Sequence, residues 1–359
     1  MSPPACLESL LIVKLSSIGD VVQSLPVAAA LRRRFPEAYL AWAVKPAAAE
    51  VVAGSPHLDE TLVIGGREGR HGVSALPPLG RPRALARELR RRRFTVSVDM
   101  QGLLKSAFLA YLSGARERIG FRNWQEGAFL FNNRRVVRDR RDVHAVAAYL
   151  EFAAALDAPS EPLDFTIATT PEDRRAAAAL VECRTNLIGL VPGARWLSKQ
   201  WPVSSFAAVA ETLGRELGAT SVVVGAAGDG PAAADIAARA RAPVLDLTGR
   251  TSLKQLAEVF RRCRVVVGNE TGPMYIASAV GAPTVTIFGP TDPRRLGPWG
   301  EGHRKVWAAP RCGPCRRRAC RPLRCMEAIS VEQVVAAARE IVRPPLGANE
   351  CPAVDRNRD

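Results

Sequence analysis

The stretch Val265–Gly289, VVVGNETGPMYIASAVGAPTVTIFG, constrains the fold of this 359-residue chain more than any other segment. It predicts a buried strand at 264–267, a polar turn at 268–272, a helix beginning at Pro273 and a second strand at 284–288. Proline suits the start of a helix, where its missing N–H is not needed. Thr271 and Gly272 then lie where the free amides of a helix N-terminus converge, which is a natural anion site. A phosphate site is one interpretation of this turn, and an ordinary α/β turn is the other.

The same order of strand, Gly- or Ser-bearing turn and helix recurs along the chain. Strands are predicted at 10–13, 39–44, 61–64 and 94–98, and again at 187–191, 221–225 and 244–247. Such alternation is typical of parallel sheets with helices on both faces. The length suggests two domains, which we place at 1–170 and 171–344, followed by a disordered tail at 345–359. The predicted fold class is therefore α/β, with two Rossmann-like parallel-sheet domains facing across a cleft.

Composition limits the partners and the compartment. A net charge of +15 and a pI near 10.2 indicate an anionic partner: a nucleotide, a phosphorylated lipid, a membrane face or nucleic acid. No apolar run approaches the roughly 20 residues that cross a bilayer, and the N-terminus lacks the pattern of a signal peptide. We therefore expect a cytoplasmic protein.

Several charged residues follow predicted strands, where open α/β sheets bind their ligands. Asp20, in KLSSIGD, is expected to face a cleft or to cap a helix. Lys105 opposes a helix dipole and has either an anionic partner or only solvent. Lys199 is placed to meet a phosphate held at Thr271. Asp229 is a candidate for a ribose hydroxyl or for a helix cap.

Two other stretches between the predicted strands carry information. The Gly-, Pro- and Arg-rich stretch 65–82 predicts a long loop. Arginines and aromatics interleave over 116–142, a pattern that suits single-stranded nucleic acid, a phosphorylated and partly apolar acceptor, or simply core aromatics beside solvated arginines. Neither GxGxxG nor GxxxxGK[ST] occurs, so the usual signatures of dinucleotide oxidoreductases and P-loop NTPases are absent.

Four motifs together resemble those of a known family. In chain order they are LIVKLSSIGDVVQSLPVAAALRRRFP, DMQGLLKSA, KQWP and VVVGNETGPMYIASAVGAPTVTIFGPTDP. They are similar to the motifs of glycosyltransferase family 9, which contains the ADP-heptose:lipopolysaccharide heptosyltransferases, and the likeness runs from about Leu10 to Val342. The forms SSIGD and DMQGLLKSA look most like heptosyltransferase I, which acts on Kdo-lipid A.

The resemblance implies a fold, a reaction and partners. The fold is GT-B, with the acceptor held mainly by the N-terminal domain and the nucleotide-sugar by the C-terminal domain. The reaction is inverting transfer of L-glycero-D-manno-heptose from ADP-heptose to the Kdo/inner-core region of lipopolysaccharide, with no cofactor required. The enzyme would act peripherally at the inner face of the inner membrane, and no nucleic acid is expected.

The resemblance also implies residue roles. Asp20 matches the SS-x-GD aspartate, which is the general base in similar enzymes. Lys199, Thr271 and Gly272 match positions that bind the diphosphate, where a lysine and backbone amides would stabilise the charge on ADP without a metal. Further donor contacts are expected at Glu270, Tyr275 and Asp229. Acceptor contacts are expected at Ser16, Gly19, Gln101, Lys105 and Arg122.

One departure from the family pattern concerns the donor loop. Similar proteins often read D-T-G-x-x-H, whereas this chain reads Glu270-Thr271-Gly272-Pro273-Met274-Tyr275. Tyr275 donates a hydrogen bond but carries no positive charge near neutral pH. Weaker phosphate binding or a different donor would follow. Two alternatives therefore stay open: a transferase with another nucleotide-sugar or a later core acceptor, and a non-catalytic basic protein that binds RNA or an anionic membrane.

A cysteine cluster near the C-terminus raises a separate question. Cys312, Cys315, Cys320 and Cys325 form C-x2-C-x4-C-x4-C within the segment 312–325. Four thiolates at short spacing suit a structural zinc, and the neighbouring arginines favour thiolates. Free or redox-active thiols and a nucleic-acid-binding knuckle are the alternatives.

Overall fold

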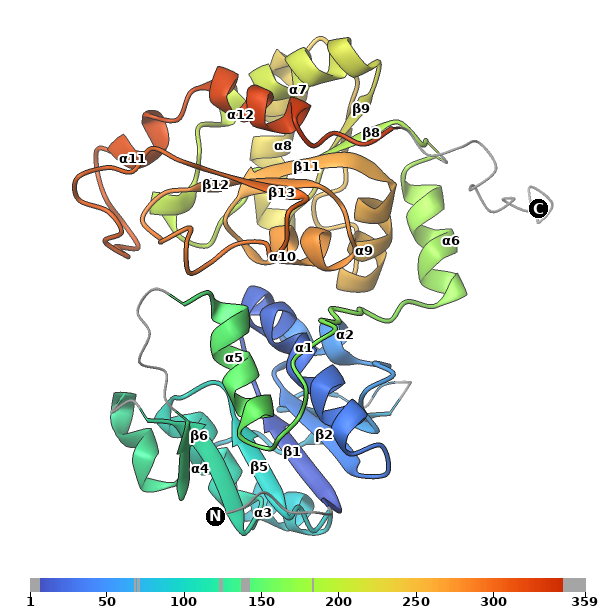
Figure 1. The fold of residues 1–359 in the computed structure, drawn as a ribbon. Coiled ribbons are helices and arrows are strands. Elements are labelled where there is room, and N and C mark those ends of the chain that lie inside the picture. Colours follow the sequence, from blue (N-terminus) through green and yellow to red (C-terminus); the bar gives the residue numbers. More distant parts are fainter. Residues whose placement is uncertain are drawn as a thin grey trace, which may run out of the picture. The chain divides into compact units, whose positions relative to one another are not determined.

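The structure is a computed structural model that describes residues 7–67, 69, 72–122, 125–136, 143–182 and 184–344. The chain divides into two compact units, Met1–Ala168 and Thr169–Asp359, which we call the N-terminal and C-terminal units (Figure 1). Our predicted boundary lies two residues further along the chain. The predicted tail at 345–359 lies outside the described residues.

The N-terminal unit contains a sheet of seven parallel strands, β1 (Ser9–Val13), β2 (Tyr39–Val44), β3 (Glu60–Ile64), β4 (Val73–Leu76), β5 (Val96–Asp99), β6 (Glu117–Phe121) and β7 (Arg134–Val136). Their spatial order is β4-β3-β2-β1-β5-β6-β7. The helical elements are α1 (Ile18–Arg34), η1 (Pro46–Ala48), α2 (Ala49–Val52), α3 (Pro82–Arg90), α4 (Leu104–Leu112), η2 (Gln125–Leu130) and α5 (Ala145–Ala154). The strand order reverses between β1 and β5, which is where such sheets bind ligands.

The C-terminal unit contains a sheet of six parallel strands, β8 (Leu187–Val191), β9 (Thr220–Val223), β10 (Val244–Asp246), β11 (Cys263–Asn269), β12 (Thr284–Phe288) and β13 (His303–Trp307). Their order is β10-β9-β8-β11-β12-β13, with the reversal between β8 and β11. The helical elements are α6 (Pro171–Leu180), η3 (Leu197–Lys199), α7 (Val203–Leu217), η4 (Ala227–Asp229), α8 (Gly230–Arg239), α9 (Leu253–Arg262), α10 (Gly272–Ala279), α11 (Arg324–Glu327) and α12 (Val331–Arg339).

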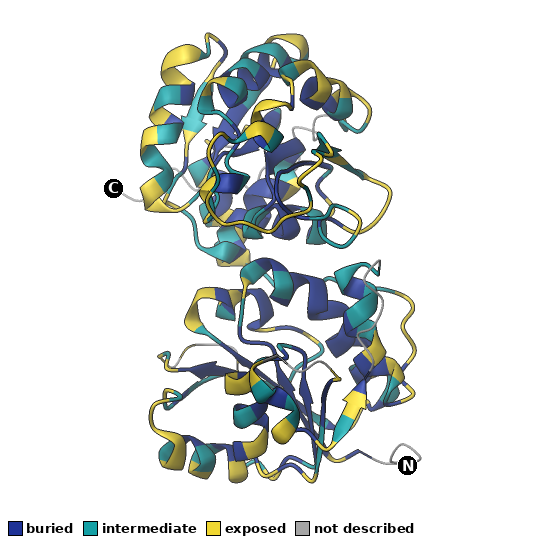
Figure 2. Ribbon diagram, turned by 90° about the vertical axis from the view of Figure 1, so that its left-hand side faces the viewer, coloured by how far each residue is buried: buried dark blue, intermediate teal, exposed yellow. Residues whose placement is uncertain are grey.

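Burial follows from the parallel arrangement. Strands β1, β8 and β12 are buried along their whole length, because helices cover both faces of a parallel sheet. In Figure 2 the inner strands are dark blue, and the exposed residues lie mainly on helices, connections and edge strands. Each unit has its own apolar core. The predicted α/β class with two parallel-sheet domains is thus confirmed. Every helix in the described ranges is too short or too polar to span a bilayer.

Four strands are missing from the sequence prediction. Strand β4 lies inside the predicted loop at 65–82, and that loop prediction is wrong there. Strands β6, β7 and β13 were not predicted. Strands β4, β7 and β13 lie at sheet edges, and their partly exposed residues do not give the long apolar run of an inner strand.

Candidate active site

Asp20 lies at the carboxyl edge of the N-terminal sheet. Helix α1 begins just after β1, with Ser17 as its N-cap and Asp20 as its third residue. The Asp20 carboxylate therefore turns back toward Ser17: its Oδ2 accepts hydrogen bonds from Ser17 N (3.1 Å) and Ser17 Oγ (2.7 Å). Asp20 is therefore not the N-cap of α1: Ser17 is the N-cap, and Asp20 completes the capping box from the third helical position.

The other oxygen of Asp20 faces two residues that sequence reasoning did not select. Tyr149 OH, on α5, donates to Asp20 Oδ1 at 3.0 Å. Lys14 Nζ donates to Tyr149 OH at 2.8 Å and to Met100 O at 3.2 Å, and it lies 4.0 Å from Asp20 Oδ1. Lys14 is almost fully buried, whereas the Asp20 side chain is 38% exposed. A buried cation thus supports a carboxylate that a ligand can reach.

The surroundings keep Asp20 ionised. Burial raises the pKa of Asp20, but the positive charge of Lys14 and the hydrogen bonds from Ser17 and Tyr149 outweigh it and leave the pKa below the ordinary value of 3.8. The carboxylate is therefore negative at neutral pH. It can accept a proton from a bound hydroxyl or hold a cationic centre.

Gln101 anchors the loop that leads to Asp20. Its Oε1 accepts hydrogen bonds from Leu15 N (3.2 Å) and Ser16 N (3.1 Å), so the predicted residues Ser16 and Gln101 lie together. The buried Asp99 holds the next turn, because its Oδ1 accepts from Gln101 N (3.1 Å) and Gly102 N (3.2 Å). Burial raises the pKa of Asp99 to about 6 despite those hydrogen bonds.

The remaining acceptor-side candidates lie along the same edge. Gly19 is buried in the first turn of α1. Lys105 is exposed in the first turn of α4, and Arg122 is exposed directly after β6. Because β1, β5 and β6 are neighbours in the sheet, these residues share its carboxyl edge with Asp20. This edge can bind an anionic ligand beside an ionised carboxylate.

In the C-terminal unit, Lys199 and Glu270 form a nearly buried ion pair. Lys199 ends η3, after β8, and Glu270 follows β11, the neighbouring strand. Lys199 Nζ donates to the Glu270 carboxylate and, at 3.4 Å, to Glu270 O. The ammonium also lies 4.6 Å from the centre of the Trp196 ring. Lys199 is therefore held in one place at the carboxyl edge of the sheet.

Glu270 and Tyr275 belong to the same hydrogen-bond network. Tyr275 OH donates to Glu270 Oε1 at 2.7 Å, and Thr291 Oγ1 donates to Glu270 Oε2 at 2.9 Å. Tyr275 OH in turn accepts from Gly297 N at 3.1 Å. Glu270 and Tyr275 are both about 5% exposed. Glu270 holds the Lys199 ammonium in place, and Tyr275 holds the Glu270 carboxylate. The carboxylate itself would repel a phosphate rather than bind it.

Thr271 and Gly272 form the N-terminus of α10, as predicted. Thr271 is the N-cap and its side chain makes no capping hydrogen bond; Gly272 is the first helical residue and Pro273 the second. The positive end of the helix dipole is therefore next to the Lys199–Glu270 pair. A cation and a helix N-terminus at one edge suit a diphosphate.

Asp229 connects two turns of the C-terminal unit. Its Oδ2 accepts a hydrogen bond from Ala226 N at 2.8 Å. A Cβ added at Gly193 or at Gly225 would lie 2.4 Å from the same oxygen, so the carboxylate packs on both glycines. Asp229 precedes α8 but makes no side-chain cap to it. The carboxylate is half-buried between the turns that follow β8 and β9, beside the donor-side residues.

Three of the clustered cysteines lie between β13 and α11, and the fourth, Cys325, lies in α11. Cys312 and Cys315 are exposed, and Cys320 and Cys325 are half-buried. Burial and the neighbouring thiols raise the pKa of Cys325. Within the described ranges, no three His, Cys, Asp or Glu side chains are arranged to hold a metal ion. The geometry does not form the predicted zinc site, which stays a prediction for metal analysis to test.

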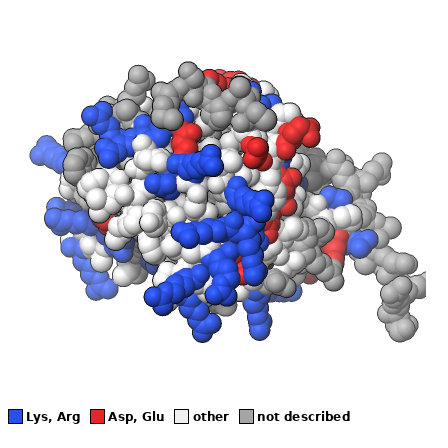
Figure 3. Space-filling view, turned by 90° about the horizontal axis from the view of Figure 1, so that it is seen from below, with Lys and Arg blue, Asp and Glu red and all other residues white. Residues whose placement is uncertain are grey.

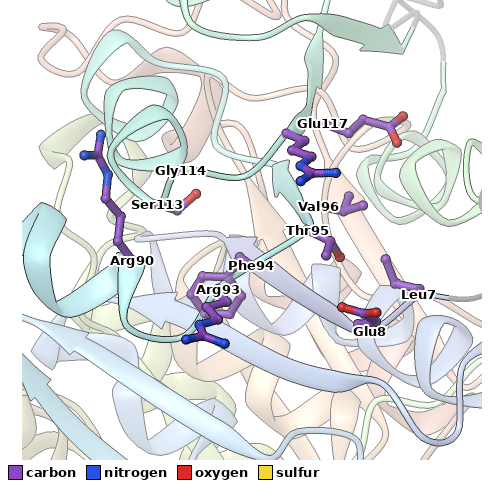
Figure 4. Close-up of a pocket in the computed structure, with 11 residues that line it drawn as sticks. Leu7, Glu8, Arg90, Arg93, Phe94, Thr95, Val96, Ser113, Gly114 and Glu117 are labelled. Carbon is purple, nitrogen blue, oxygen red and sulfur yellow. The ribbon is translucent and has the colours of Figure 1, made fainter.

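A pocket lies away from these residues, at the amino edge of the N-terminal sheet (Figure 4). The starts of β1, β5 and β6 line it, together with Arg90, Arg93 and Arg116. No residue predicted for the acceptor side is among its lining residues.

The most informative residues that sequence reasoning missed are Lys14, Tyr149 and Thr291. Lys14 had a local signal, because a lysine directly after an apolar strand of a parallel sheet is at the ligand-binding edge. Tyr149 and Thr291 had none: each comes from a helix or connection distant in sequence from its partner.

The fold is that of a two-domain α/β protein with parallel sheets, with an ionised carboxylate at the edge of one sheet and a lysine beside a helix N-terminus at the edge of the other. The chain matches the family model described as "Glycosyltransferase family 9 (heptosyltransferase)" over residues 82–325, and it belongs to this family. The predicted family, the GT-B fold and glycosyltransferase activity are thereby confirmed.

Individual relatives agree with this assignment. The chain is 28% identical to lipopolysaccharide heptosyltransferase 1 of Pseudomonas aeruginosa, with 86% of each chain covered. It is 25% identical to the lipopolysaccharide core heptosyltransferase OpsX of Haemophilus influenzae, covering 81% of this chain and 82% of the relative.

Solved structures share the fold. A family 9 glycosyltransferase from Veillonella parvula gives a TM-score of 0.80 at 23% identity, covering 94% of this chain and 97% of that one. An Escherichia coli heptosyltransferase solved with ADP gives 0.67 at 22% identity, covering 92% and 97%.

Proposed function

We propose that this glycosyltransferase moves L-glycero-D-manno-heptose from ADP-heptose to the Kdo/inner-core region of lipopolysaccharide. The observation that carries the proposal is the Asp20 carboxylate, which Lys14, Ser17 and Tyr149 hold ionised at the ligand-binding edge of a family 9 fold. Relatives named as lipopolysaccharide heptosyltransferases support the substrate class.

In the proposed reaction, Asp20 is the general base. An acceptor hydroxyl oxygen bonds to the anomeric carbon of the heptose, the bond from that carbon to the diphosphate oxygen breaks, and ADP leaves. The hydroxyl proton passes to Asp20. Attack on the face opposite the leaving group inverts the anomeric configuration. Since the pKa of Asp20 is low, the proton transfers late, once the attacking oxygen has become acidic.

The C-terminal unit would stabilise the negative charge that develops on the leaving ADP. Lys199 and the amides at Thr271 and Gly272 are fixed before the donor binds, so they stabilise the leaving diphosphate without reorganising. Glu270 lowers the net charge at this corner but keeps Lys199 in position. We propose that Asp229 accepts a hydrogen bond from a ribose hydroxyl of the donor. We propose that no metal ion takes part, so transfer continues in the presence of a chelator.

A second candidate concerns the choice of substrates. Glu270 and Tyr275 stand where similar proteins often have aspartate and histidine, and both lie in the network around Lys199. This difference favours testing other nucleotide-sugars and later core acceptors alongside ADP-heptose. The non-catalytic binding alternative is not supported, because the chain belongs to a family of enzymes.

The first experiment measures transfer from ADP-heptose to Kdo2-lipid A by the wild type and by Asp20→Asn. We expect product from the wild type, and a loss of orders of magnitude in kcat for the variant with ADP binding unchanged. Full activity of Asp20→Asn would remove Asp20 from the mechanism. Absence of product with ADP-heptose, but transfer from another donor in a panel, would favour the second candidate.

A further inference from the structure

An exposed apolar patch covers part of α4 and η2 in the N-terminal unit. Five large hydrophobic residues in the described part of the chain are exposed, and three of them are here: Leu104 (41%), Tyr111 (46%) and Leu130 (70%). Together with Phe108 and Phe131, we call them the α4–η2 patch. A soluble surface seldom collects such residues unless they contact something.

The patch follows from the sequence of α4. Leu104, Phe108 and Tyr111 are spaced four and three residues apart, so they form one stripe along the helix. The rest of the helix is largely apolar as well: Ala107 and Leu112 flank the stripe, Leu109 and Ala110 lie opposite it, and all four are buried. Helix α3 is different: Leu85 and Leu89 are buried, and apart from Pro82 at its start its exposed positions are arginines. Helix α4 is thus apolar on both faces, although one face is open.

Aromatic packing fixes the shape of the patch. The Phe131 ring lies 5.4 Å from Phe108 and 5.5 Å from Tyr111, centre to centre, and Phe108 stacks on Tyr111 at 6.5 Å. Leu130, directly before Phe131, is left projecting into solvent. The three rings pack on one another beside the exposed leucine, so this part of the patch is ordered before it meets a partner, which lowers the entropy cost of binding.

Several cations lie on or next to the elements that form the patch. Lys105, Arg116, Arg122 and Arg135 are exposed on the same elements or next to them. The Arg118 guanidinium lies 5.6 Å from the centre of the Tyr111 ring. Of the nearby acids among the described residues, Glu117 pairs with Arg134, and the exposed Glu126 accepts a hydrogen bond from Leu104 N. Figure 3 looks onto the end of the N-terminal unit that carries α3, and Lys and Arg gather there beside uncharged surface. The surroundings of the patch are therefore net positive.

We propose that the α4–η2 patch docks the enzyme on an anionic phospholipid bilayer. Leucine and tyrosine side chains would enter the boundary between headgroups and acyl chains, while the surrounding arginines and Lys105 contact lipid phosphates. The benefit of docking rests on the proposed function, in which the acceptor is linked to a lipid. Helix α4 connects the carboxyl end of β5 to the amino end of β6, so the patch runs from Leu104, at the sheet edge of Asp20, toward Ser113 at the amino edge. Docking through it would hold the N-terminal unit on the bilayer in which a lipid-linked acceptor lies.

The test is co-sedimentation of the full chain with vesicles, without any substrate. We expect binding to vesicles of phosphatidylglycerol and phosphatidylethanolamine, weaker binding to phosphatidylcholine, and weakening by salt. Tyr111→Asp/Leu130→Asp should lower the affinity about tenfold or more, since two apolar anchors are lost. Gly80→Asp is the matched control: it adds a charge at an exposed site of the same unit where a new Cβ meets nothing within 4 Å. Leu130→Trp should strengthen binding.

A second arm separates docking from catalysis. The double variant should lose transfer to Kdo2-lipid A embedded in those vesicles but retain transfer to a deacylated, soluble acceptor. Unchanged vesicle binding in both the double variant and Leu130→Trp would overturn the proposal. So would a double variant whose only change is loss of self-association in sedimentation equilibrium, because the patch would then join two copies of the chain. Failure of the wild type to transfer to either acceptor would overturn the proposed function, while the sedimentation result would still decide the docking.

Discussion

At the scale of single residues, Asp20 is ionised because of its neighbours, as the proposed role of general base requires. Its pKa lies below 3.8, so it stays ionised throughout the neutral range. The proposed activity is present above that pKa and is lost as the pH falls through it. We expect kcat/KM to be flat from neutral pH down to about 4, with the acid limb below that value.

Tyr149→Phe and Lys14→Met test this origin of the low pKa. Each removes a contribution that lowers the pKa of Asp20, so each should move the acid limb of the profile to higher pH, Lys14→Met the further. Tyr111→Phe, assayed with a soluble acceptor, is the control for loss of a tyrosine hydroxyl. An acid limb that stays in place in both variants would show that another group sets it.

Lys199 offers a second test at this scale. A charge-assisted hydrogen bond is worth about 1.5–3 kcal/mol, so Lys199→Gln should weaken ADP binding about tenfold or more.

Glu270→Gln keeps the shape of the network but removes the negative charge. It should lower the free energy of unfolding, because Lys199 is left without its ion pair, while ADP binding is kept or strengthened. Titration calorimetry measures ADP affinity and scanning calorimetry measures stability. Arg215→Gln, at an exposed arginine that forms an ion pair on the surface, is the control for both. Weaker ADP binding in Glu270→Gln would mean that the carboxylate positions Lys199 more than it competes with phosphate.

At the scale of secondary-structure elements, the turns after β8 and β9 must approach each other closely around Asp229. Gly193→Ala places a Cβ 2.4 Å from Asp229 Oδ2, so the carboxylate must move. We expect a loss of about 1–3 kcal/mol in unfolding free energy and weaker ADP binding. Gly228→Ala, in the adjacent η4, meets nothing within 4 Å and serves as the control. Equal effects of the two substitutions would contradict this packing.

At the scale of the whole molecule, each unit has its own sheet and core. We propose that the donor binds to the C-terminal unit. Hydrogen exchange with saturating ADP tests the assignment. Exchange should slow at 192–201 and 269–275 in the C-terminal unit, since bound ligand stabilises the segments that hold it. The segment 13–20 should keep its exchange rate. Protection confined to the N-terminal unit would reverse the proposed division of roles.

Much of the architecture could be predicted because its signals are local. Apolar runs such as Leu187–Val191 identify inner parallel strands, and the Gly and Pro of 268–273 place a turn and a helix start. The edge strands β4, β7 and β13 were not predicted, because a strand that is exposed on one side needs no continuous apolar run. The division of the chain near 168 follows from the break in the strand–helix order.

The sequence alone determined the α/β class, the family, and the positions of Asp20, Lys199 and Thr271 at the ends of strands, because each depends on a short motif or a local periodicity. The tertiary structure decided what these residues touch. Tyr149 reaches Asp20 across 129 positions, and Glu270 reaches Lys199 across 71. Protonation and ligand charge depend on such neighbours, and only the packing of helices on the sheets brings them together.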